Sequence, residues 1–378
     1  MYNDKIKIRN SNLEILRILS MLLIVFHHYA GHGFETIEKT YSFNRYVVGI
    51  LSLGGKLGVV CFILISGYFM LYSKFTLNKL IKLIAETWFY TVGIGILFLF
   101  VLTPVESIGV IDLIKLILPI GYSQYWFMTD YIMLMLVSPV LNLLISKMSK
   151  EMHRNLLICG IMLWSIMPSF ALAKYEFSEL GWFVVLYILA GYIRKYMDHE
   201  KKNARKHFLG AVISYSMVIL SSVLLVFLGH VMNIQIFSDN STYFAALNSP
   251  FVLLTGIELF VGFIKLKLYH NQVVNRLASA TLGVYLIHDN EMFRPYLWRV
   301  ILKNAEMYTS PLLIVHASVS VVVVYLVCSC IDLLRQNTVE RIFLNIMDRH
   351  LEQIKRLLLR SIKHVCQKVG AILTWYYE

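Results

Sequence analysis

The chain has 378 residues, of which 58% are hydrophobic and only 15% are charged. A soluble domain would carry about a quarter charged residues, so the composition excludes a soluble protein and indicates a polytopic membrane protein. The net charge of +12 lies mainly between the apolar runs, as in the loops of a membrane protein, and we expect no nucleic-acid partner.

The first apolar stretch, residues 13–30, contains two ionisable groups, Arg17 and His28. An arginine near the centre of a membrane helix costs about 3 kcal/mol on insertion scales. Eleven helical steps of about 100° return to nearly the same face about 16 Å further along. The two residues therefore share one stripe of the predicted helix with Met21 and Ile24, and they could line one path across the membrane.

Structural interpretations of the same stretch also exist. It is similar in length to a signal peptide, but Arg17 interrupts its core and many apolar segments follow, so we expect it to be retained. Glu14 lies three residues before Arg17 and could neutralise it on the same helix. His27 is rotated by about 100° from His28, so at most one of them points along the stripe. Two adjacent histidines could also be ordinary interface residues.

Apolar runs of membrane-spanning length recur along the chain, and we predict about ten transmembrane helices with both termini cytoplasmic. The spans are expected at residues 13–30, 46–72, 79–103, 124–147, 154–172, 179–196, 208–230, 244–265, 273–290 and 308–334. The apolar stretch 107–120 is short, and we expect it to lie at the surface or to re-enter the membrane.

The loop charges support this topology. Every segment predicted to be cytoplasmic carries at least three Lys or Arg residues, whereas no predicted outside loop carries more than three. A missed span would invert every later loop and spoil the alternation. We therefore predict an all-α, multi-pass domain over residues 1–334, embedded in the lipid bilayer of the cytoplasmic membrane.

The C-terminal tail, residues 335–378, differs from the rest of the chain. Its apolar residues recur at helical spacing, and Lys and Arg occupy the other faces. This pattern predicts an amphipathic helix on the cytoplasmic leaflet, attracted by anionic lipid. A helix packed on the protein's own cytoplasmic side would give the same pattern, so both interpretations stay open.

Further ionisable residues fall inside the predicted spans, and the topology gives each a depth. Those expected toward the cytoplasm are Arg17, Glu86 and Glu258, and those expected toward the outside are His27, His28, Lys56, Asp130, His288 and His316. An ion pair or hydrogen bond that fixes helix packing would explain most of them, and Lys56 could pair with Asp130. The five cysteines show neither metal-ligand spacing nor a disulfide framework, and we expect no metal site.

The first span, LEILRILSMLLIVFHHYAGHG, resembles the opening of the acyltransferase-3 family of integral membrane acyltransferases, in its bacterial O-acetyltransferase branch. The family's first helix carries an Arg-x10-His pattern, which Arg17 and His28 match. Similar stretches follow in order: FILISGYFM at 62–70, YWFMTDYIMLMLVSPVLN at 125–142 and TLGVYLIHDN at 281–290. The resemblance covers most of the chain.

This resemblance implies transfer of an acyl group, usually acetyl, from cytoplasmic acyl-CoA to a hydroxyl of a saccharide, as in polysaccharide modification at the cell envelope. It implies a catalytic role for His28, with Arg17 supporting the donor site or the histidine. Acyl-CoA is then a donor substrate, and no bound cofactor is expected. Where many members have an Arg-x-Arg pair at the start of the third span, this chain has Lys79 and Lys82. These lysines could attract the phosphates of acyl-CoA, or they are ordinary loop charge.

Other residues are weaker candidates for a substrate cavity. His27, Ser66, Tyr68 and His288 could line it, although Ser66 beside Gly67 suits helix packing better. His288 could orient a sugar or pair with Asp289 or Glu291, which follow it. Trp126 could stack on a sugar ring or belong to the interfacial aromatic belt. Many family members carry a glutamate in this stretch, and Asp130 is the nearest acidic residue here.

Three competing functions remain at this stage: a transporter or flippase for a saccharide or acylated precursor, a polysaccharide polymerase, and a non-catalytic membrane sensor. The chain shows no paired halves typical of many transporters and no large outside loop typical of polymerases.

Overall fold

The computed structural model describes residues 10–35, 41–98, 109–170, 177–197 and 203–347. Within these ranges the chain forms helices and turns and contains no strand, so the predicted all-α class is confirmed. The main helices are α1 (Ser11–Gly33), α2 (Phe43–Ser52), α3 (Gly54–Met70), α4 (Leu77–Leu97), α5 (Val110–Ile117), α6 (Trp126–Lys147), α7 (Lys150–Ile161), α9 (Glu179–Tyr196), α10 (Ala204–Val231), α12 (Pro250–Lys265), α13 (Gln272–Ser279), α14 (Thr281–His288) and α16 (Leu313–Arg335).

Seven helical segments of the described chain are long and apolar enough to cross a membrane. They are Ser11–Gly33, Phe43–Met70, Leu77–Leu97, Trp126–Lys147, Ala204–Val231, Gln235–Lys265 and Leu313–Met347. The prediction of ten spans is therefore supported for seven, and the two cytoplasmic termini stay a prediction.

The three remaining predicted spans are helical but differ in form. In the range 154–172, α7 gives way to a π-helical turn, Met162–Ile166, and a short helix α8, Met167–Ser169. The helix α9 is continuous but carries charges at both ends. In the range 273–290 the chain breaks at Ala280 into α13 and α14, each about 12 Å long and too short to cross a hydrocarbon core of about 30 Å.

Helix α1 begins with a side-chain cap and is held at both ends. The Asn10 side chain accepts a hydrogen bond from the Asn12 backbone N–H at 3.1 Å, which satisfies one free donor of the first turn. Ser11 Oγ donates to Asn275 Oδ1 of α13 at 2.8 Å. At the other end, Asn304 Nδ2 donates to the Tyr29 carbonyl oxygen at 3.1 Å. These contacts fix α1 along its length.

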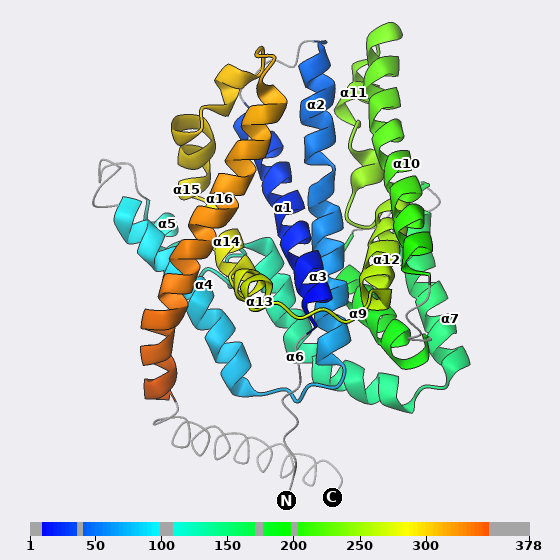
Figure 1. The fold of residues 1–378 in the computed structure, drawn as a ribbon, viewed down its shortest axis with the longest axis vertical. Helices are drawn as coiled ribbons and strands as arrows, with labels where there is room; N and C mark the ends of the chain where they lie inside the picture. Colours follow the sequence, from blue (N-terminus) through cyan, green and yellow to red (C-terminus); the bar gives the residue numbers. More distant parts are fainter. Residues whose placement is uncertain (1–9, 36–40, 99–108, 171–176, 198–202, 348–378) are drawn as a thin grey trace, which may run out of the picture. The chain divides into compact units, whose positions relative to one another are not determined.

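Glycines allow α1 and α3 to pack closely. A Cβ atom at Gly58 would lie 2.5 Å from the Ser20 carbonyl oxygen, and one at Gly55 would overlap the ring of His27. Small residues at such positions let helix backbones approach in membranes. Figure 1 shows α1 in dark blue alongside α3, and α13 and α14 also contact α1.

The chain divides into two compact units, residues 1–329 and 330–378. Everything described below for the site belongs to the first unit. In the second unit, Arg335 bridges Asp332 and Glu340, with nitrogen–oxygen distances of 2.8 Å to each. The predicted amphipathic tail falls mostly on residues 348–378, outside the described chain, and it stays a prediction.

Candidate active site

A cavity of about 580 Å³ runs along the inner face of α1, and we call it the His28 cavity. Its lining includes Arg17, Met21, Ile24 and His28, so the whole predicted stripe faces one space. The other walls come from α3, α4, α6, α13 and α14, together with Asp289 and Arg294 beyond the end of α14. The volume falls within the range of about 300–1,000 Å³ typical of small-molecule sites.

Arg17 lies at one end of this stripe and is paired. Its Nη1 atom is 2.7 Å from Glu14 Oε2, and the Glu14 side chain is 3% exposed. The predicted pairing on the same helix is thus present. Because Arg17 still lines the cavity, its guanidinium has further donors available to a ligand there.

His28 lies toward the other end of the stripe and contacts a second histidine. His28 Nδ1 is 2.9 Å from Nε2 of His288, and His288 Nδ1 is 2.6 Å from the Val284 carbonyl oxygen. A carbonyl oxygen only accepts, so His288 donates from Nδ1, and as a neutral ring it offers Nε2 as an acceptor. His28 then donates from Nδ1 and keeps the lone pair on Nε2. Full burial of His288 favours this neutral form.

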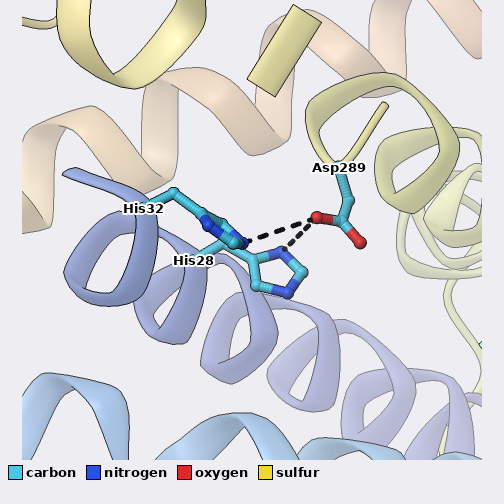
Figure 2. A group of neighbouring side chains, drawn as sticks. All are labelled: His28, His32 and Asp289. Atoms are coloured by element: carbon cyan, nitrogen blue, oxygen red, sulfur yellow. Dashed lines mark ion pairs between the residues drawn. The ribbon is translucent and has the colours of Figure 1, made fainter. Parts of the chain in front are cut away.

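Asp289 gathers three basic side chains around one carboxylate. Its Oδ1 atom lies 3.6 Å from His28 Nδ1, 3.8 Å from His32 Nε2 and 3.2 Å from Arg294 Nη1. Figure 2 shows both histidines reaching from α1 toward Asp289, which directly follows α14. Because Asp289 is only 6% exposed, its negative charge can stabilise a positive charge that forms on His28.

The His32 ring is oriented by a second carboxylate. His32 Nδ1 lies 2.9 Å from Glu35 Oε1, and the other Glu35 oxygen contacts Arg299. Partial burial raises the pKa of Glu35, but the hydrogen bonds and charges of His32 and Arg299 outweigh it and lower the pKa below its ordinary value. The acidic and basic groups at this end of the cavity therefore form one connected network.

The atoms of His28, His32 and Asp289 that point at one another lie within 4.8 Å and are types that bind metal ions. Two of the three already face protein partners. Arg294 donates to the Asp289 oxygen, and His28 Nδ1 is engaged with His288. A hydrogen-bond network therefore accounts for the arrangement without a metal ligand set.

Several of the weaker candidates also line the His28 cavity. His27, Ser66 and Trp126 do so, and Ser66 Oγ accepts a hydrogen bond from Tyr131 at 3.3 Å. His288 does not reach the cavity, because it is buried behind His28 and contacts the ring of His28 instead.

Other candidates lie elsewhere. Tyr68 turns toward α12, where its ring packs on Phe260 and lies under the Arg194 guanidinium, so it does not line the His28 cavity. Asp130 does not line the His28 cavity either, and among the described residues no ion pair joins it to Lys56. The Lys56 ammonium instead lies 4.5 Å from the centre of the Trp126 ring.

The two lysines at the start of α4 are near the cavity but not in it. Lys79 Nζ donates to Ser73 Oγ at 2.7 Å, and neither Lys79 nor Lys82 belongs to the lining. Leu83, next to Lys82 on the same helix, does line the cavity. A role for these lysines in binding acyl-CoA stays a prediction.

Sequence reasoning assigned no role to His32 or Arg294, and it offered Asp289 only as a partner of His288. His32 follows His28 by four residues, so the helical period alone places it on the same face. Asp289 and Arg294 gave no such signal, because Asp289 meets His28 across about 260 residues of sequence and Arg294 joins the site through Asp289.

These features define a multi-pass, all-helical membrane protein with a basic, histidine-containing site inside the helix bundle. The family model described as an acyltransferase domain, Acyl_transf_3, matches residues 10–332. The chain therefore belongs to the acyltransferase-3 family and is a membrane acyltransferase. Comparisons with curated proteins and with solved structures give no match.

Proposed function

We propose that this protein transfers an acyl group, most often acetyl in its family, from cytoplasmic acyl-CoA to a hydroxyl of a cell-surface or lipid-linked saccharide. The observation that carries the proposal is the single cavity lined by both Arg17 and His28. The loop charges support a cytoplasmic Arg17 end and an outer His28 end in the cytoplasmic membrane.

The donor would enter at the Arg17 end. The phosphates of acyl-CoA would be attracted by Arg17 and by Lys79 and Lys82 on the first turns of α4. The rise from Arg17 to His28 is about 16 Å, a distance that an extended pantetheine arm can cover. The thioester would then reach His28 while the nucleotide stays on the cytoplasmic side.

His28 would act as the general base. Its Nε2 lone pair would take the proton from the acceptor hydroxyl as the hydroxyl oxygen attacks the thioester carbonyl. The carbon–sulfur bond of the resulting tetrahedral species then breaks, and the CoA thiolate leaves with the proton from Nε2. Both products carry the atoms of the two substrates, and the histidine is restored.

Asp289 and His288 would support this step without touching the substrate. The Asp289 carboxylate, 3.6 Å from Nδ1, would stabilise the imidazolium form of His28. His288 would hold the ring in the tautomer that leaves Nε2 free. A route through an acyl-histidine intermediate would use the same Nε2 lone pair. Trapping of acylated His28 would reveal that route.

Transfer of labelled acetyl from acetyl-CoA to saccharide in membrane vesicles tests the proposal. We expect His28→Ala to abolish transfer while membrane insertion and abundance stay at the wild-type level. His270→Ala is a matched control, because His270 is exposed and does not line the His28 cavity. Full transfer by His28→Ala would contradict the proposal.

One observation favours transport as a second candidate. The break between α13 and α14 adjoins the His28 cavity, since Ser279 and Thr281 line it, and broken helices mark substrate sites in many transporters. A transporter would move saccharide across vesicles without releasing CoA from acetyl-CoA. Release of CoA that depends on His28 would exclude this candidate as the main activity.

A further inference from the structure

A second cavity, of about 670 Å³, lies where α1 ends, and we call it the Arg45 cavity. Its walls come from the end of α1, from α2 and α8, and from the segment between α10 and α12. Characteristic lining residues are Gly31, Arg45, Gly49, Asp239, Thr242 and Asn248. The loop charges predict that these segments face the outside.

The Arg45 cavity adjoins the His28 cavity at two shared residues. His27 and Lys56 line both cavities, whereas His28 lines only the His28 cavity. Their side chains are held in place: His27 Nδ1 contacts the Ser52 carbonyl oxygen, and Lys56 lies over the ring of Trp126. The close packing of Gly55 against His27 brings the two residues together.

The two cavities differ in the kind of polar group that they carry. The lining of the His28 cavity combines aliphatic and aromatic side chains with charged or titratable groups such as Arg17, His28 and Asp289, as suits the charged donor and the proton transfer proposed there. The segment between α10 and α12, which we call the loop side of the Arg45 cavity, contributes hydroxyl, amide and charged groups, among them Ser238, Asp239 and Thr242. Groups of these kinds donate and accept hydrogen bonds, as a ligand with many hydroxyls requires.

The loop side of this cavity is also tied to the helices. The Tyr243 hydroxyl lies 3.3 Å from the Pro168 carbonyl oxygen and 3.2 Å from that of Ser169, and it can donate to either. Asn248 Nδ2 donates to the Trp164 carbonyl oxygen at 2.8 Å. A surface fixed in this way is organised before a ligand arrives, which limits the entropy lost on binding.

We infer that the Arg45 cavity binds the acceptor saccharide from the outer face and presents one of its hydroxyls to His28 past His27 and Lys56. This inference rests on the proposed function and adds a separate acceptor site to it. Donor and acceptor then approach from opposite ends and meet only where the two cavities adjoin.

Two glycines provide a direct test. A Cβ atom at Gly31 or Gly49 meets no atom within 4 Å, so a cysteine there points into open space. In Gly49→Cys, a bulky, membrane-impermeant thiol reagent should modify the cavity wall from outside. De-O-acetylated envelope polysaccharide from the source cells should slow that modification by about tenfold or more, a factor that corresponds to 1.4 kcal/mol of binding.

Gly121→Cys is the matched control, because its Cβ would meet only the Leu118 carbonyl oxygen at 3.7 Å and Gly121 lines neither cavity. Its modification rate should not change with polysaccharide. The wild-type chain, treated in the same way, gives the background from its own cysteines. After modification, Gly49→Cys should lose transfer to saccharide but keep binding of acetyl-CoA.

The outcomes separate the two proposals. Protection of Gly49→Cys with loss of transfer after modification supports the acceptor site. Transfer by the wild type without protection of Gly49→Cys overturns the acceptor site alone. If modification of Gly49→Cys abolishes both acetyl-CoA binding and transfer, the acceptor site is also overturned, because the cavity would then bind the donor. Absence of both wild-type transfer and protection overturns the acceptor site and the proposed function together.

Discussion

His288 holds the ring of His28 through a 2.9 Å contact between Nε2 of the former and Nδ1 of the latter. The Val284 carbonyl oxygen fixes the tautomer of His288, and His288 in turn fixes that of His28. The nitrogen of His28 that keeps its lone pair is thus selected by a residue that does not line the His28 cavity.

Removal of the hydrogen-bond acceptor that His288 Nε2 offers to His28 should slow catalysis without weakening the binding of acetyl-CoA. We expect His288→Leu to lower kcat by about a hundredfold, since a wrongly oriented base loses most of a general-base contribution of about 10²–10⁴. KM for acetyl-CoA should stay unchanged. His288→Gln keeps an acceptor oxygen for His28 Nδ1 and should recover part of the rate. Equal kcat values for the two variants would contradict a positioning role.

Arg17 should contribute to donor affinity. In Arg17→Gln we expect the apparent KM for acetyl-CoA to rise by about tenfold, because a charge-assisted bond to phosphate or carbonyl is lost. Arg17→Lys keeps the positive charge beside Glu14, which is 2.7 Å from Arg17, and should be affected less. Steady-state kinetics on vesicles of matched protein content measures both. An unchanged KM in Arg17→Gln would refute the donor role.

The contact between α1 and α3 should tolerate no side chain at Gly58. The Cβ atom of Gly58→Ala would lie 2.5 Å from the Ser20 carbonyl oxygen, which belongs to a helix backbone and cannot turn away. We expect about 1–3 kcal/mol of destabilisation, typical of overpacking, and a lower unfolding temperature in detergent. Gly93→Ala meets no atom within 4 Å and should leave that temperature unchanged or raise it. Equal stability of the two variants would count against the close packing.

The ion pairs of Glu35 should give a small, pH-dependent stabilisation. Because the pKa of Glu35 is lowered in the folded protein, its contribution is present above the ordinary carboxyl pKa and is lost as pH falls through the folded value. Glu35→Gln should lower the unfolding temperature slightly at neutral pH and match the wild type in acid. Since Glu35 is half exposed, about 1 kcal/mol is the most we expect. A difference that persists in acid would point to a packing effect instead.

The part of the site that lies on one helix could be predicted from the sequence, whereas the contacts between distant segments could not. The alignment of Arg17 with His28 depends only on the period of one helix, and both residues line one cavity. The contacts of His28 with His288 and Asp289 depend on how α14 packs against α1, which no local pattern encodes. The sequence allowed a pair of Lys56 and Asp130, and the structure instead places the Lys56 ammonium 4.5 Å from the centre of the Trp126 ring.

The same limit applies to the fold. Apolar runs predicted where the helices lie, because burial in lipid requires about twenty apolar residues for each crossing. They did not predict the break at Ala280, which divides one apolar run into two short helices. A hydropathy pattern records composition along the chain and is almost insensitive to a change of helix direction within a run.

The glycine contacts between α1 and α3 also bear on how such an enzyme can change its substrate. They leave no space for new side chains beside His27, so the junction of the two cavities cannot be redesigned without separating the helices. The loop side of the Arg45 cavity has no such restriction, because the segment between α10 and α12 is built from turns and short helices. We expect acceptor preference to diverge among relatives through this segment, while the helix pair that carries His28 stays constant.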